Sequence, residues 1–309
     1  MKAVFLDRGS FPASIKFNYP EGLCDVIEHP STQAHQTLDR IKGFEVILSN
    51  KVPLSAEVLS QCPSVKLILV TATGTNNIDQ AYCSANNILV KNVSGYSINS
   101  VPEHTFSLLL ALKRNLISYS QATEKGQWGE AEHFCFHDFP ISDLAGSNLV
   151  IFGKGALGNQ VAKIAEAFGM KTYFSERKNA SNVRDGYIAF DKALELADVI
   201  SFHCPLTDDN KHMIDKDAFL KMKSNCVLIN TGRGGLVEET ALAEAIKNKQ
   251  IAGAGFDVAS IEPMPNSHLL KALSQEPNFI LTPHVAWASH DSMQTLANTS
   301  MQQLNEFLA

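Results

Sequence analysis

Short apolar runs alternate with helical stretches along the whole chain. In the first hundred residues, strands are predicted at 2–6, 45–48, 65–70 and 88–91, with helical stretches such as 54–61 and 77–86 between them. A second series of strands is predicted at 148–152, 171–175, 198–202, 226–230, 253–257 and 279–282. Short apolar strands separated by helices are typical of parallel sheets covered on both faces. The pattern predicts an α/β chain with two doubly wound parallel-sheet domains.

The residues 100–117 give the clearest helix signal. Ser100 is a good N-cap, and Glu103 completes a Ser-x-x-Glu capping box. The body of this helix is apolar nearly all round up to Lys113, so we expect it to be buried between domains or at a subunit interface. A last helix is predicted over 289–308, and the pattern alone does not assign it to either domain.

Composition narrows the class of protein. The 309 residues are 45% hydrophobic, enough for two ordinary domains, and the net charge of -6 gives no electrostatic reason to bind nucleic acid or an anionic membrane. The six cysteines are widely spaced, without a Cys-x-x-Cys pair, so we expect no metal site and a reducing, cytoplasmic location. The first apolar run is too short for a signal peptide, and no run reaches the roughly 20 residues of a membrane span. A small molecule is the expected partner.

A glycine motif follows the predicted strand 148–152. It reads Gly153-Lys-Gly155-Ala156-Leu157-Gly158 and opens a helical stretch that leads to the strand 171–175. Such glycines allow a tight turn and close approach of a pyrophosphate, which binds at the helix N-terminus. In this context the motif predicts a dinucleotide site.

The second strand of this unit ends at Glu176. A carboxylate there would accept hydrogen bonds from the adenosine ribose hydroxyls and repel a 2′-phosphate, which favours NAD. Arg177 and Lys178 follow at once and could hold that phosphate, so NADP is not excluded.

Further candidate site residues lie at or just after the ends of the next four predicted strands. Ligands of open parallel sheets bind beyond the carboxyl ends of the strands. An arginine, two carboxylates and two histidines therefore come to the edge where the pyrophosphate is expected. An arginine binds a substrate carboxylate, a histidine exchanges a proton near neutral pH, and a carboxylate beside that histidine favours its charged form. The residues are His203, Cys204 and Pro205; Thr231, Gly232 and Arg233; Asp257 and Glu262; and His284 and Ala286.

Motifs over most of the chain resemble those of the D-isomer-specific 2-hydroxyacid dehydrogenases. They are ATGTNNID at 72–79, SVPEHTFSLLLALKRN at 100–115, GKGALG at 153–158, HCPLT at 203–207, INTGRGGLV at 229–237, GFDVASIEP at 255–263 and TPHVAWAS at 282–289. The resemblance implies that Arg233, Glu262 and His284 are catalytic and that Asp257 lies near the nicotinamide carboxamide. It implies that main-chain amides of Thr73 and Gly74 hold the substrate carboxylate.

The same resemblance implies a domain organisation. A flavodoxin-like substrate domain would comprise 1–99, completed by 286–309, and a Rossmann domain would comprise 100–285. Members are typically homodimers joined through the Rossmann domains, which suits an apolar helix at 100–117.

Within the family, the chain looks most like glycerate dehydrogenases, also called hydroxypyruvate reductases. The features are the sequence Trp287-Ala-Ser after the histidine, the acidic position Ser-Glu176-Arg-Lys, and a helix that begins VPEH. We expect reduction of hydroxypyruvate or glyoxylate by NADH to D-glycerate or glycolate. The alternatives are a broad-specificity 2-keto-acid reductase and a non-catalytic NAD-sensing binding protein. The role of Lys154, within the glycine motif, is open.

Overall fold

The computed structural model describes all 309 residues, which form two compact units. Unit 1 comprises Met1–Ser97 together with Ala288–Ala309, and unit 2 comprises Ile98–Trp287. No helix is long and apolar enough to cross a membrane. Each unit is described separately below.

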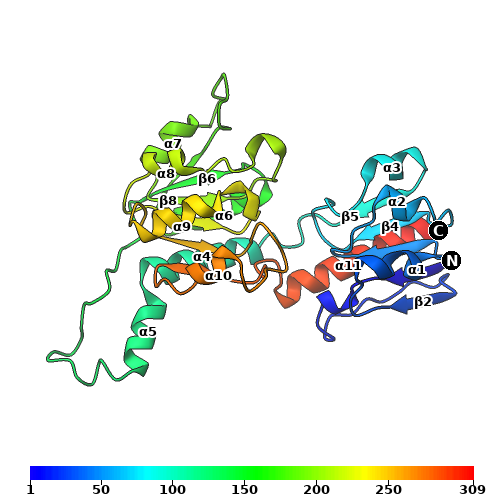
Figure 1. Ribbon diagram of the computed structural model, residues 1–309, viewed down its shortest axis with the longest axis horizontal. Helices are drawn as coiled ribbons and strands as arrows, with labels where there is room; N and C mark the ends of the chain where they lie inside the picture. Colours follow the sequence, from blue (N-terminus) through cyan, green and yellow to red (C-terminus); the bar gives the residue numbers. More distant parts are fainter. The chain divides into compact units, whose positions relative to one another are not determined.

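Unit 1 is built on a five-stranded parallel sheet with the order β2-β1-β3-β4-β5 (Figure 1). The central strands β3 and β4 are buried along their whole length, because helices cover both faces. The C-terminal helix α11 belongs to this unit: the Gln303 side chain donates to the Asn92 carbonyl at the end of β5, 3.0 Å away. The elements are β1 (Lys2–Phe5), β2 (Asp25–Glu28), α1 (Thr37–Ile41), β3 (Val46–Ser49), α2 (Ala56–Leu59), β4 (Leu67–Val70), α3 (Gln80–Ala85), β5 (Leu89–Asn92) and α11 (His290–Leu308), with 3₁₀ turns at Arg8–Ser10 and Ala34–Gln36.

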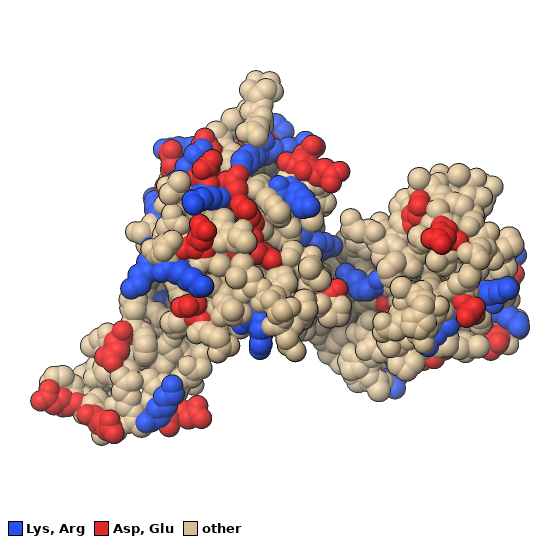
Figure 2. Space-filling model, viewed as in Figure 1, with Lys and Arg blue, Asp and Glu red and all other residues tan.

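Unit 2 is built on a six-stranded parallel sheet with the order β11-β10-β9-β8-β6-β7. The strands are β6 (Asn148–Phe152), β7 (Lys171–Phe174), β8 (Val199–Phe202), β9 (Val227–Asn230), β10 (Gly253–Phe256) and β11 (Phe279–Leu281). The helices are α4 (Ser100–Lys113), α5 (Leu116–Glu124), α6 (Ala156–Ala167), α7 (Phe190–Leu196), α8 (Lys216–Lys221), α9 (Glu239–Lys247) and α10 (Leu269–Leu273), with 3₁₀ turns at Asp208–Asn210 and Gly234–Leu236. Positive and negative side chains are interspersed over the visible face of this unit (Figure 2).

Alternate side chains of the unit 2 strands enter two separate cores. In β6, Val150 packs with residues of α7, α8, α9 and α10, whereas Leu149 and Ile151 pack with residues of α4 and α6. This alternation follows from the two-residue period of a strand. The fold class predicted from the sequence, two parallel α/β sheets covered by helices, is confirmed.

The chain leaves β6 at a topological switch point. Strand β6 pairs with β7 on one side and with β8 on the other, so successive connections run in opposite directions from it. In open α/β sheets the crevice outside the carboxyl ends of two such strands is where ligands bind. The loops that begin at Gly153 and His203 lie at this point.

The structure corrects the prediction for 100–117. Helix α4 ends at Lys113, and Asn115 adopts a left-handed conformation with φ of 48° before α5 begins. Ser100 is the first helical residue and forms no capping box, because its hydroxyl donates to the Ala286 carbonyl at 2.6 Å. Helix α4 packs on α6, β9, β10 and β11 of its own unit, so its apolar surface is largely covered there.

Candidate active site

The glycine loop has the shape that a dinucleotide pyrophosphate needs. A Cβ at Gly153 would lie 2.4 Å from the His203 carbonyl oxygen, and one at Gly158 would lie 1.9 Å from the Gly153 carbonyl oxygen. A Cβ at Gly155 would meet no atom within 4 Å. Two glycines therefore allow close backbone packing, while the third leaves open space at the N-terminus of α6, where no side chain caps the helix. This arrangement fits a phosphate group bound by main-chain N–H groups.

His203 lies opposite this loop, at the end of β8. Its Nε2 is 2.8 Å from the Ser201 hydroxyl, whereas its Nδ1 is buried without a hydrogen-bond partner. Burial lowers the pKa of His203 to about 4, so the ring is neutral at physiological pH. Burial also raises the pKa of the neighbouring Cys204 thiol to about 11, which makes a thiolate nucleophile unavailable there. An unpartnered ring nitrogen at the switch point fits a residue that contacts a bound ligand.

Glu176 follows β7, and its side chain is 3% exposed. Both carboxylate oxygens accept hydrogen bonds from Arg184, at 2.7 Å from Nε and 2.7 Å from Nη2. The main-chain N–H groups of Arg177 and Arg184 donate to the same carboxylate, at 2.9 and 3.2 Å. The sequence interpretation placed ribose hydroxyls on this carboxylate, but its acceptor sites are filled within the chain. Lys178 is also engaged, since its ammonium group contacts the Met213 carbonyl and the Asp215 carboxylate.

Arg233 is placed by a turn packed on the loop after β10. A Cβ at Gly234 would lie 2.1 Å from the Ala259 carbonyl carbon, so only glycine permits this approach. The Arg233 guanidinium donates to the Gly232 carbonyl at 2.7 Å and is half-buried. Ala259 in turn donates its N–H to Glu262 at 2.9 Å. These contacts connect the turn that carries Arg233 with the carboxylate of Glu262.

His284 and Glu262 form a close pair. The distance from His284 Nδ1 to Glu262 Oε2 is 2.6 Å, and the two side chains are 25% and 34% exposed. His284 has a φ of 55°, a conformation that residues other than glycine rarely adopt. The side chain of Trp287 donates to the His284 carbonyl at 3.0 Å and helps to hold this backbone. With Nδ1 directed at the carboxylate, Nε2 is left without a partner in the chain.

Asp257 organises the loop on which His284 lies. The Asp257 side chain is fully buried at the end of β10, and it accepts hydrogen bonds from the Thr282 hydroxyl at 2.5 Å and from the main-chain N–H groups of Val285 and Ala286 at 2.9 and 2.8 Å. The three donors lie on both sides of His284. The carboxylate therefore fixes the backbone that orients the imidazole.

Comparison with known proteins places these features in a family. Residues 106–286 match the model of the D-isomer specific 2-hydroxyacid dehydrogenase, NAD binding domain. The chain belongs to this family. The chain is 44% identical to a glycerate dehydrogenase of Methylorubrum extorquens, over 100% of this chain and 96% of the relative. It is 33% identical to a hydroxypyruvate reductase of Blautia hydrogenotrophica, over 100% and 97%.

A solved structure of the same fold is a D-lactate dehydrogenase from Aquifex aeolicus, complexed with NAD and lactic acid. It matches with a TM-score of 0.85 and 28% identity over 99% of this chain and 95% of that one. The chain described here is thus an NAD-dependent dehydrogenase of the D-2-hydroxyacid family. The resemblance stated from the sequence motifs is confirmed.

In unit 1, the loop that carries the predicted carboxylate-binding amides follows β4. The Thr73 hydroxyl donates to the Val93 carbonyl at 3.0 Å, and Asn92 donates its side-chain amide to the Thr73 carbonyl at 2.5 Å. The main-chain N–H groups of Thr73 and Gly74 donate to no group of the chain. Both N–H groups are therefore open to an external acceptor.

Sequence reasoning missed three residues of the site. Arg184 lies in a polar segment without a motif, and nothing in its spacing connects it to Glu176. Thr282 and Trp287 lie within the motif around His284, but their contacts with Asp257 and with the main chain depend on the loop conformation. The only signal that could have pointed to Arg184 is the excess of basic residues after β7.

Proposed function

We propose that this dehydrogenase reduces hydroxypyruvate or glyoxylate with NADH, giving D-glycerate or glycolate. The observation that carries the proposal is the contact of 2.6 Å between His284 Nδ1 and Glu262 Oε2, which leaves Nε2 to serve a substrate oxygen. The identity of 44% to a glycerate dehydrogenase over the whole chain supports the choice of substrate.

In the proposed reaction, NADH supplies the hydride that reaches the carbonyl carbon. His284 donates the Nε2 proton to the carbonyl oxygen as negative charge develops on it. Glu262 accepts the Nδ1 hydrogen bond, which fixes the ring orientation. In the oxidation of the hydroxy acid, the neutral ring takes the proton back.

Binding of the substrate carboxylate requires hydrogen-bond donors that are permanently charged or held in a fixed position. We propose that Arg233 pairs with its two oxygens, because a guanidinium presents parallel N–H groups that match a carboxylate. We assign the second set of donors to the Thr73 and Gly74 amides, which have no partner within the chain.

The remaining predicted residues are assigned to NAD. Gly153, Gly155 and Gly158, with Ala156 and Leu157 of the first turn of α6, would hold the pyrophosphate. The nearby ends of β8, β9, β10 and β11 would line the rest of the cofactor. These residues are His203, Cys204, Pro205, Thr231, Gly232, Asp257 and Ala286.

A steady-state panel tests this proposal. NADH oxidation is measured with hydroxypyruvate, glyoxylate, pyruvate and the amide of hydroxypyruvate. We expect the highest kcat/KM for hydroxypyruvate or glyoxylate and very low turnover of the uncharged amide. Equal kcat/KM for all four compounds would remove Arg233 from the proposed role, and no oxidation with any keto acid would exclude the proposed reaction.

We also propose that the enzyme is a homodimer joined through unit 2. The support comes from the arm, defined here as residues 116–141, which comprises α5 and the loop after it and projects from the body of unit 2 (Figure 1). The arm carries apolar side chains that face solvent in the single chain. They are Leu116, Ile117, Trp128, Phe134 and Ile141, with exposures of 61%, 43%, 56%, 89% and 48%.

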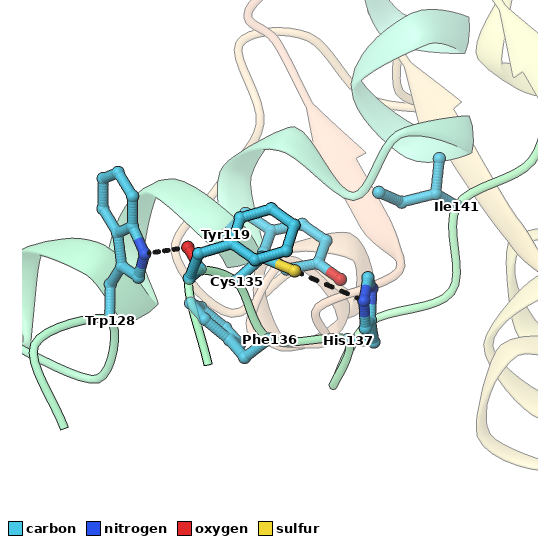
Figure 3. Close-up of a pocket in the computed structure, with 7 residues that line it drawn as sticks. Tyr119, Trp128, Cys135, Phe136, His137 and Ile141 are labelled. Carbon is cyan, nitrogen blue, oxygen red and sulfur yellow. Dashed lines mark hydrogen bonds between the residues drawn. The ribbon is translucent and has the colours of Figure 1, made fainter. Parts of the chain in front are cut away.

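Part of this apolar surface is hollow (Figure 3). The Trp128 indole donates to the Phe134 carbonyl at 2.8 Å, and Tyr119 and Phe136 form the aromatic lining beside it. An exposed apolar surface of this kind is typical of a subunit interface. We propose that the arm of a second copy packs on this surface, because two-fold symmetry then lets the apolar surfaces of the two arms cover each other.

We place the enzyme in the cytoplasm. All six cysteines are free thiols, and three of them, Cys62, Cys83 and Cys226, are buried. Unpaired thiols are usual in a reducing compartment.

A further inference from the structure

The carboxylate of Glu176 is saturated by its own chain. A carboxylate has about four acceptor sites on its two oxygens. Here each oxygen accepts one bond from the Arg184 guanidinium and one from a main-chain N–H, of Arg177 or of Arg184. No acceptor site remains for the 2′- and 3′-hydroxyls of an adenosine ribose.

The Arg184 guanidinium is also held by an aromatic ring. The guanidinium lies over the Tyr187 ring, 4.1 Å from the centroid. The Lys154 ammonium lies 5.2 Å from the same ring and 5.1 Å from the ring of Phe174. Lys154 belongs to the glycine loop, so two cations and the paired carboxylate stand beside the end of β7, where the adenosine half of a dinucleotide is expected.

The end of β7 presents positive charge to solvent, although it carries the carboxylate of Glu176. The Arg184 side chain is 52% exposed, so its charge faces solvent while the charge of Glu176 is buried and compensated. Arg177 is exposed next to it. An uncompensated carboxylate would repel a 2′-phosphate, whereas this arrangement presents it with positive charge.

We propose that Arg184 determines the cofactor selectivity of this enzyme by occupying Glu176, so that NADPH is accepted as well as NADH. The proposal rests on the proposed function, because it assumes that the NAD site assigned there extends to the end of β7, with the adenosine ribose near Glu176. Arg184 acts as a positioning residue for Glu176. It occupies the carboxylate oxygens that would otherwise accept hydrogen bonds from the ribose hydroxyls, and it supplies a positive charge that can attract a 2′-phosphate.

Binding measurements test this proposal without any keto acid. Dissociation constants for NADH and NADPH are measured by nucleotide fluorescence with the wild type, Arg184→Ala and Glu176→Ala/Arg184→Ala. For the wild type we expect the two constants to differ by less than about 10-fold, because no charge rejects the phosphate. In Arg184→Ala the preference for NADH should rise roughly 10- to 100-fold, the range for hydrogen bonds to a charged group. In the double variant the preference should return close to the wild-type value, because the freed carboxylate is gone.

Two variants guard against simpler explanations. Arg114→Ala removes an arginine that is 49% exposed and paired with Asp143 at 2.9 Å, and it should leave the ratio unchanged. Arg184→Lys keeps the charge but cannot form two parallel bonds, so it should give an intermediate ratio and replaces Arg184→Ala if that variant does not fold.

Three results would overturn the proposal. They are a wild type that binds NADH but not NADPH, an unchanged ratio in Arg184→Ala, and equal weakening of both nucleotides in that variant. A wild type that binds neither nucleotide would contradict the cofactor assignment itself, and failure of the keto-acid panel alone would leave these binding constants interpretable.

Discussion

At the scale of single residues, Gly155 and Gly158 meet opposite requirements in one loop. A methyl group at Gly158 would collide with the Gly153 carbonyl at 1.9 Å, whereas at Gly155 it would meet nothing within 4 Å. We therefore expect Gly158→Ala to lower Tm, because the backbone must shift. Gly155→Ala should keep the wild-type Tm but weaken NADH binding, because the methyl group fills the space assigned to the pyrophosphate. Calorimetry and NADH titration of the two variants check this.

The two glycine variants serve as controls for each other. Unchanged NADH affinity in Gly155→Ala would remove the pyrophosphate from the N-terminus of α6. A wild-type Tm for Gly158→Ala would show that the loop relaxes without cost.

At the scale of elements, the Glu176 carboxylate at the end of β7 holds the segment 177–184 through its ion pair with Arg184 and through main-chain N–H groups. The Arg184 hydrogen bonds lower the pKa of Glu176 from 4.5 to about 2. A carboxyl with a lowered pKa in the folded state stabilises the protein above its unfolded pKa, and this contribution is lost as pH falls from about 4.5 through 2. Arg184→Ala should therefore lower Tm at pH 7, and the difference from the wild type should shrink toward pH 3. A constant difference over this range would show that the pair is not the source of the stability.

The elements also show how far sequence reasoning reached. Strands buried on both faces, such as β6 and β9, were predicted because helices on either side require continuous apolar runs. Strand β2 was missed, because three of its four residues are exposed and only Val26 is partly buried, so its pattern resembles a loop. The prediction that Ser100 caps the helix was wrong, because the Ser100 hydroxyl donates to the Ala286 carbonyl instead.

The candidate site divides in the same way. The positions of Arg233, Glu262 and His284 followed from topology, since the ends of parallel strands share one edge. The pairing of Glu176 with Arg184 did not, because it depends on how the loop after β7 folds back over eight residues. Contacts that a regular element dictates could be predicted, and contacts made by an irregular loop could not.

At the scale of the whole molecule, the arm should join two copies of the chain. Light scattering is expected to give about twice the chain mass of 33.8 kDa. Phe134→Glu places a charge on a side chain that is 89% exposed, so it should shift the mass toward the single chain without lowering the stability of unit 2. Leu220→Glu, at another exposed leucine (64%) of unit 2, is the matched control and should stay dimeric. A wild-type mass near 33.8 kDa at micromolar concentration would refute the dimer.

The central claim concerns the His284–Glu262 pair, and the turnover of hydroxypyruvate by variants of the two residues tests it most directly. His284→Ala removes the proposed proton donor, so kcat should fall roughly 10²–10⁴-fold. Glu262→Gln keeps the shape of the side chain but removes the charge 2.6 Å from Nδ1, so kcat should also fall while NADH affinity stays near that of the wild type. Near-normal turnover in either variant would contradict the account.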